Sequence, residues 1–148
     1  DLSAKASEIQ ALKDLHTKLI DSRNGYEEAL RQAEGDDHII VFQELAAAHQ
    51  TASVEIELRL VALGVTPETS GSLLSTLNQT MMDIRALFTG LGDAVLPALI
   101  SAEQQNVASY DGAIAGAGAD FAPILVASRQ TLLDLIGKME RLHARAQA

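Results

Sequence analysis

Apolar residues recur along the chain at steps of three, four or seven, the spacing that lines one side of an α-helix. The first such run predicts a helix over about residues 3 to 33. Gly35 can end this helix, and Asp36 or Asp37 can cap a second helix that turns straight back and ends at Gly64. The inward positions of the two helices are Ile9, Leu12, Leu15, Leu19, Tyr26 and Leu30, then Phe42, Leu45, His49, Ala52, Ile56 and Leu63.

A connector with a short helix of its own follows this first helix pair. Gly64 to Ser70 contains Pro67 and is typical of a loop, and Ser70 or Ser72 can cap a short helix that Gly90 closes. The apolar positions of the short helix are Leu73, Leu77, Met81, Ile84 and Phe88. A long connection of this kind makes the helices on either side of it run parallel.

Two further long helices complete the predicted set. Asp93 caps the first, where Pro97 is tolerated near the first turn; the small residues of Ala115 to Ala119 form a turn, and Asp120 with the early Pro123 starts the last helix. The inward positions are Leu96, Leu99, Glu103, Val107, Tyr110 and Ile114, then Leu125, Leu132, Leu135, Met139 and Leu142. The pattern predicts an all-α protein, a ferritin-like antiparallel four-helix bundle with a short extra helix in the crossover between helices 2 and 3.

Length and composition agree with this fold class. A chain of 148 residues fits a single domain spanning residues 1–148 and can bury a continuous core. Aromatic residues make up only 3% of the chain and tryptophan is absent, which suits helix-on-helix packing. The absence of cysteine excludes disulfides, thiolate metal sites and cysteine nucleophiles.

The net charge and the hydropathy of the chain limit the kinds of partner that it can bind. The net charge of −9 disfavours nucleic acid and anionic membrane surfaces, and no run approaches the roughly 20 apolar residues of a membrane span. We therefore expect a water-soluble, cytoplasmic protein that binds neither nucleic acid nor membrane. Because the chain starts at Asp1, we also expect that an upstream segment was removed.

The inner positions contain fragments of a di-metal carboxylate site. Such a site needs a Glu from each of two helices and a Glu-x-x-His from each of the other two. Glu103 lies two turns before Tyr110, a spacing typical of ferritin-like metal helices, but Leu19 stands seven residues before Tyr26. Ala46 stands three residues before the inward His49. The ligand set for two metals is therefore incomplete.

A count of ~1.5 Å per residue along each helix places Glu103, His49, Arg23 and Asp134 at similar depth. We favour a hydrogen-bonded or ion-paired polar layer that fixes the helix register, because a buried charge must find a partner. The alternative is a reduced mono- or di-metal centre. Its candidate ligands for iron, manganese or zinc are Glu103, His49 and Asp134, with Tyr26 or Tyr110 beside them.

Other polar residues give weaker evidence of a functional site. The pair Glu140 and His143 has the Glu-x-x-His spacing but lies outside the inner stripe, near the helix end, where a solvated role is favoured. His16 lies near the inner edge of the first helix and predicts a second polar layer. The depth count puts it near Tyr110, Asp111 and Gln130. No phosphate loop, nucleophile elbow or His-Glu-x-x-His motif occurs, so no catalytic residue is predicted.

Several short segments resemble a bacterial ferritin-like four-helix-bundle family of unassigned function, of the domain-of-unknown-function 2383 type, often grouped with stress-associated genes. The resemblance is carried by Asp21-Ser22, Gly25-Tyr26-Glu27-Glu28-Ala29, Leu63-Gly64, Pro67, Ser70-Gly71-Ser72, Asp83-Ile84-Arg85, Leu87-Phe88-Thr89-Gly90 and the helix from Glu103 to Tyr110. The chain departs from the family at Thr80-Met81 and at Gln104-Gln105, where relatives have an aromatic or basic residue and a second acid. These departures weaken the metal hypothesis.

The sequence therefore favours a non-enzymatic structural or interaction protein with a degenerate metal site. We expect a homo-oligomer, most simply a twofold dimer through helix faces, and no cofactor. A metal-binding ferritin-like protein is the alternative function. The protein partner is not predicted.

Overall fold

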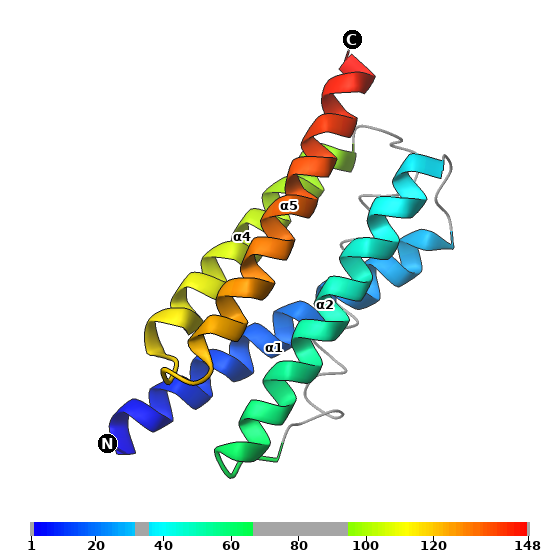
Figure 1. The fold of residues 1–148 in the computed structure, drawn as a ribbon. Helices are drawn as coiled ribbons and strands as arrows, with labels where there is room; N and C mark the ends of the chain where they lie inside the picture. Colours follow the sequence, from blue (N-terminus) through cyan, green and yellow to red (C-terminus); the bar gives the residue numbers. More distant parts are fainter. Residues whose placement is uncertain (1, 32–35, 67–94, 148) are drawn as a thin grey trace.

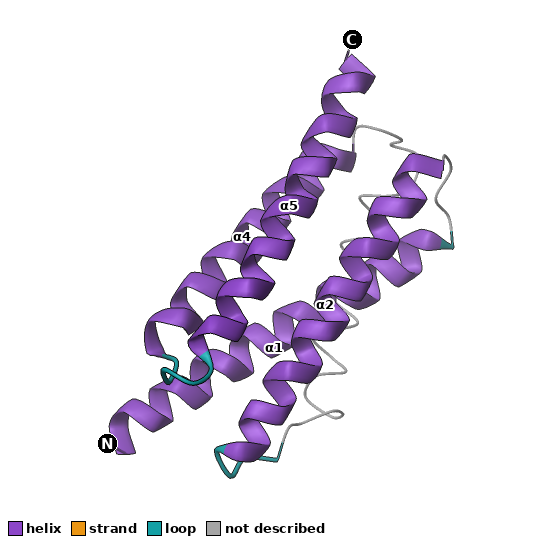
Figure 2. Ribbon diagram, viewed as in Figure 1, coloured by secondary structure: helices purple, strands orange, loops and turns teal. Residues whose placement is uncertain are grey.

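The computed structural model describes residues 2–31, 36–66 and 95–147, and these residues form four long helices and no strand (Figures 1 and 2). The helices are α1 (Leu2–Leu30), α2 (Asp36–Ala62), α4 (Val95–Gly116) and α5 (Ala122–Gln147). The predicted all-α four-helix bundle is confirmed. The predicted short crossover helix lies outside the described residues.

The helix ends agree closely with the turn residues in the sequence. Gly64 has a φ of 85°, a left-handed conformation that glycine adopts without a side-chain clash. Its N–H donates to the carbonyl of Val61 at 2.9 Å, and the N–H of Val65 donates to the carbonyl of Leu60 at 2.9 Å. These two bonds form a Schellman motif, which closes α2 where Gly64 was predicted to end it.

The start of the last helix differs slightly from its prediction. Asp120 lies in the turn between α4 and α5, and α5 begins at Ala122. Asp120 accepts a hydrogen bond from Arg59 of α2, so its carboxylate joins the turn to a different helix. The position of Pro123 in the first turn of α5 is as predicted.

The four helices pack as two antiparallel hairpins side by side. α1 pairs with α2 and α4 pairs with α5, while α1 also contacts α4 and α2 also contacts α5. In Figure 1, α2 and α4 run in the same direction, as predicted for helices joined by a long connection. None of the described helices combines the length and the apolar character that crossing a bilayer requires.

The core consists of the inward positions of all four helices. The predicted central residues are buried, including Leu12, Leu19, Leu45, Ile56 and Leu96, each 0% exposed. Edge positions of the predicted stripes are only partly buried and pack against the core; these are Ile9, Leu30, Leu63, Val107, Ile114 and Leu142. The periodic pattern therefore located the core correctly, and polar residues that share these inward positions are buried with it.

Candidate functional site

A group of polar side chains surrounds Glu103 in the middle of the core. The Glu103 side chain on α4 and the His49 side chain on α2 are each 1% exposed. Oε2 of Glu103 accepts a hydrogen bond from the Tyr26 hydroxyl at 2.7 Å and lies 2.8 Å from Nε2 of His49. Its Oε1 accepts a hydrogen bond from Asn106 Nδ2 at 2.7 Å. We call Glu103, His49, Tyr26 and Asn106 the Glu103 cluster.

The Glu103 cluster joins three helices, because Tyr26 belongs to α1, His49 to α2, and the other two residues to α4. Asn106 Nδ2 also donates to the Ser22 hydroxyl of α1 at 3.0 Å. The Tyr26 ring stacks on the His49 ring with a centroid separation of 6.0 Å and an angle of 20° between planes. Tyr26 and His49 are therefore held by ring stacking as well as by polar contacts.

Electrostatics keep the Glu103 carboxylate ionised. Burial alone would raise the pKa of Glu103, but the charge interaction with His49 and the hydrogen bonds with His49, Tyr26 and Asn106 outweigh it, so that the pKa lies below its ordinary value. The pKa of Tyr26 is raised well above its ordinary value by burial, by the charge of Glu103 and by the hydrogen bond to it. The phenol thus stays protonated and acts as a donor to a charged acceptor.

Tyr110 is buried on the same helix but does not belong to the Glu103 cluster. It is 1% exposed, and its hydroxyl hydrogen-bonds with Ser128 of α5. Burial raises its pKa, and the charges of Glu103 and Glu55 raise it further. Tyr110 therefore couples α4 to α5, whereas the Glu103 cluster couples α4 to the first hairpin.

The structure does not bring the predicted residues Asp134 and Arg23 into the cluster. Asp134 is exposed on α5 and accepts a hydrogen bond from Gln130 at 2.9 Å. Arg23 is partly exposed; its Nε donates to Asn24 at 3.1 Å, and its Nη1 donates to Gln50 on α2. A depth count gives height along a helix but not the direction in which a side chain points, and both residues point away from the centre.

The second predicted polar layer is smaller than expected. His16 is buried, and its Nε2 lies 3.3 Å from Oε1 of Glu57 on α2, within ion-pair distance but without hydrogen-bond geometry. Asp111 and Gln130 are exposed and bond to other side chains, Arg129 and Asp134 respectively. His16 therefore faces the first hairpin rather than the exposed polar groups of α4 and α5.

The residues around Glu103 do not fit the di-metal centre that a ferritin-like resemblance implies. Within residues 2–31, 36–66 and 95–147, no group of three or more His, Asp or Glu side chains could hold a metal ion. Glu103 and His49 supply one carboxylate and one imidazole, and both oxygens of Glu103 already accept hydrogen bonds from protein donors. A di-metal site requires several converging carboxylates. Glu140, in the Glu-x-x-His motif, is exposed.

Sequence reasoning missed two sets of polar contacts. Asn106 stands one helical turn after Glu103, and this spacing on the same face was an available signal. Arg59 on α2 donates from Nε to Glu8 of α1 at 3.0 Å and from Nη1 to Asp120 at 2.8 Å. Its guanidinium also lies 5.5 Å from the centroid of the Phe121 ring. No local pattern indicated this contact, because the three segments it joins are far apart in sequence.

The fold and the Glu103 cluster define an all-α four-helix bundle with a buried polar layer and no complete set of metal ligands among the described residues. The family model described as "Domain of unknown function (DUF2383)" matches residues 7–116, which include most of α1 and all of α2 and α4. The chain belongs to this family, as its resemblance predicted. No curated protein and no solved structure matches the chain.

Proposed function

We propose that this protein is a non-enzymatic four-helix bundle that acts by binding protein partners, including further copies of itself, and that the Glu103 cluster is a structural polar layer. The observation that carries the proposal is the hydrogen bonding of Glu103 by three protein side chains. Donors from α1, α2 and α4 occupy both oxygens of a carboxylate that is 1% exposed. A carboxylate arranged in this way holds helices together and has no free oxygen for a substrate.

A buried polar layer has a clear structural use. An apolar core alone allows helices to slide or rotate at small cost, whereas an ionised Glu that loses its donors leaves an uncompensated buried charge. The bonds from Tyr26, His49 and Asn106 can form only when α1, α2 and α4 are in one register. The layer therefore favours one arrangement of the bundle over its alternatives.

The accessible surface also supports a binding role rather than catalysis. Two grooves lie over α2 and α5, and neither is lined by Glu103, His49 or Tyr26. A substrate in either groove would not reach the buried cluster. The larger groove is lined mainly by small and aliphatic residues, which suit a packed protein surface.

The composition of the chain and its family resemblance support further statements about its partners, its compartment and its physiological role. The net charge of −9 supports a protein that binds neither nucleic acid nor anionic membranes, and the absence of cysteine agrees with a reducing, cytoplasmic compartment. The stress association and the ferritin-like ancestry are implied by the family resemblance. A degenerate metal site is consistent with the lone carboxylate in the Glu103 cluster.

The second candidate function is metal binding, and one observation favours it. His49 Nε2 and Glu103 Oε2 are adjacent and come from different helices, as ligands of one metal ion would be. Against it, the structure offers no third acidic or imidazole ligand beside them within the described chain. Metal binding would also have to displace the Tyr26 and Asn106 hydrogen bonds.

Elemental analysis of protein purified without a histidine tag separates the two functions. We expect wild-type protein to contain no stoichiometric iron, manganese or zinc, and we expect Glu103→Ala and His49→Ala to lower the thermal midpoint of unfolding. Glu140→Ala is the matched control, because Glu140 is exposed on α5. Stoichiometric metal in the wild type that both core variants lose, and that the control keeps, would overturn the structural role.

A further inference from the structure

The side of α1 that faces away from the bundle is buried along part of its length. The core residues Leu12, Leu19 and Tyr26 of α1 follow one another at seven-residue intervals. Because an α-helix turns about 100° per residue, the residue two positions after each of them lies on the opposite side of the helix. These outward residues are Asp14, Asp21 and Glu28. Asp14 is exposed, whereas Asp21 is 5% exposed and Glu28 is 8% exposed.

The neighbouring helices do not account for this burial. α1 packs against α2 and α4, and its polar contacts with them come from other positions. Lys18, for example, donates to Ser109 of α4. Gly25 lies between Asp21 and Glu28 along the helix and is also buried. The second half of α1 is therefore covered on a side that no other described helix faces.

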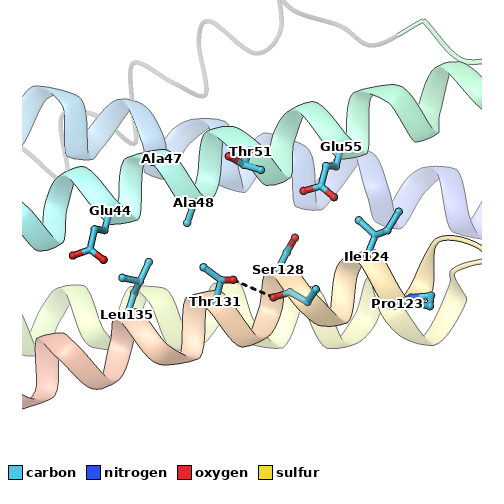
Figure 3. Close-up of a pocket in the computed structure, with 11 residues that line it drawn as sticks. Glu44, Ala47, Ala48, Thr51, Glu55, Pro123, Ile124, Ser128, Thr131 and Leu135 are labelled. Atoms are coloured by element: carbon cyan, nitrogen blue, oxygen red, sulfur yellow. Dashed lines mark hydrogen bonds between the residues drawn. The ribbon is translucent and has the colours of Figure 1, made fainter.

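The outward side of α5 gives the opposite result. Its core residues Leu125, Leu132 and Met139 have the same seven-residue interval. The residues two positions after them are all exposed, and these are Ala127, Asp134 and Arg141. A groove of about 620 Å³ between α2 and α5 is also open, and Figure 3 shows no described helix in front of its lining side chains. Among the described residues, α1 is thus covered on its outward side and α5 is not.

The connection between α2 and α4 bears on this difference. α2 and α4 lie diagonally across the bundle, because each packs against both α1 and α5. The His16–Glu57 and Tyr26–Glu103 contacts fix the relative levels of the helices, and they place the end of α2 roughly 35 Å along the bundle from the start of α4. Residues 67–94 are long enough to cover this distance along the outside of α1 or of α5. The exposure of α5 favours the path over α1.

The charge of the covered surface points to one residue of this connection. A buried carboxylate such as that of Asp21 needs a partner that offsets its charge. Residues 67–94 contain one basic residue, Arg85, which precedes Val95 by ten positions. The level of Val95 lies roughly 20 Å along the bundle from Asp21, a distance that ten residues can span.

We propose that residues 67–94 pack on the outward side of α1 and that the Arg85 guanidinium forms an ion pair with Asp21. Glu28 pairs with Arg31 of its own helix, so Asp21 is the acid assigned to Arg85. This packing depends neither on the Glu103 cluster nor on self-association, and it goes beyond the proposed function. A protein partner then meets the open side of α5 rather than the covered side of α1.

Charge exchange in the full chain tests the ion pair. Asp21→Arg and Arg85→Asp should each raise the equilibrium constant for unfolding in urea at least about tenfold, because each brings like charges together. The double variant restores opposite charges and should return the constant to within about threefold of wild type. Asp14→Arg is the matched control, because Asp14 is exposed on the same side of α1. Combining it with Arg85→Asp should give no recovery.

Crosslinking tests the packing without removing the ion pair. The chain has no cysteine, so two introduced cysteines report on one distance. Asn24 lies one helical turn after Asp21, so Asn24→Cys with Ala86→Cys should react with a short bismaleimide within a single chain. Ala127→Cys with Ala86→Cys is the matched control on the open side of α5, and it should not crosslink. Circular dichroism confirms that each variant keeps the wild-type helix content.

The outcomes separate the ion pair from the packing. A double charge variant no more stable than the single variants would overturn the Asp21–Arg85 pair. The packing on α1 is wrong if Asn24→Cys with Ala86→Cys does not crosslink, or if the control on α5 crosslinks instead. Crosslinks between two chains would identify a second copy as the occupant and would also contradict it. The elemental analysis is unaffected by these results, so failure of the packing and failure of the proposed function are distinguishable.

Discussion

Oε2 of Glu103 on α4 lies 2.8 Å from Nε2 of His49 on α2, and both side chains are 1% exposed. The two residues are 54 positions apart in sequence, so their contact exists only in the folded bundle. A charge buried this deeply is stable only while its partners stay in place. The unfolding of this protein should therefore respond strongly to changes at the pair.

Glu103→Gln should lower the free energy of unfolding by about 3 kcal/mol, because the amide keeps the shape but loses the charge that His49, Tyr26 and Asn106 surround. Urea denaturation followed by circular dichroism measures the change. The matched control is Glu140→Gln on the exposed surface of α5, which should change the free energy by less than about 0.5 kcal/mol. Equal effects of the two substitutions would contradict a structural role for the Glu103 cluster.

The contribution of Glu103 should also depend on pH. Its pKa in the folded protein lies below the ordinary value of 4.5, so its stabilising effect is fully present above that pH and is lost as the pH falls through the folded pKa. The difference in unfolding free energy between wild type and Glu103→Gln should therefore shrink as the pH falls below about 4.5. A difference that grows on acidification would mean that the folded pKa is raised instead.

The two tyrosines, Tyr26 and Tyr110, should remain protonated in the folded protein well above pH 10. Burial is the largest cause of both raised pKa values, with the charge of Glu103 adding to it. A raised folded pKa stabilises the fold below the ordinary value of 10.0, and this contribution is lost as the pH rises further. Alkaline titration should thus show phenolate absorbance appearing together with unfolding.

The chain has no tryptophan and no other tyrosine, so the phenolate absorbance reports on Tyr26 and Tyr110 alone. The control is the same titration in concentrated urea, where both phenols should ionise near pH 10. Reversible ionisation near that pH with the helical signal intact would show that a phenol is accessible to solvent.

Two glycine substitutions should have opposite effects. Gly112 is exposed within α4 with open space around its Cα, so Gly112→Ala should stabilise the protein by about 0.5–1 kcal/mol through helix propensity. A Cβ at Gly118 would lie 2.6 Å from Arg59 Nη2 and 2.8 Å from Asp120 Oδ1. Gly118→Ala should therefore displace Arg59 from Asp120 and lower the thermal midpoint, as measured by calorimetry. A midpoint raised by both variants would show that the Arg59 contacts contribute nothing.

The helices and the core could be predicted from the sequence because both depend on local rules. Apolar spacing reports the buried side of each helix, and Gly64 ends α2 because glycine adopts a positive φ without strain. The same spacing placed Glu103 and His49 at inward positions and at similar depth. A polar residue on an apolar stripe has no other direction in which to point, so their meeting was predictable.

The direction in which a residue at the edge of an apolar stripe points could not be predicted from the spacing of apolar residues. Counting along the helices predicted that Asp134 and Arg23 lie at a depth similar to that of Glu103, but a small rotation of a helix moves an edge residue from core to solvent. Asp134 instead bonds to Gln130 on its own helix, and Arg23 bonds to Gln50. The rotation of each helix is decided by how all four pack together.

Periodicity and turn residues are enough to predict four long amphipathic helices with one carboxylate on an inner stripe, because these signals act within a few positions of the chain. Which donors meet that carboxylate depends on how the helices pack. Asn106 and Ser22 entered the polar layer, and Arg59 joined Glu8 to Asp120, because packing brought together segments that no local rule relates.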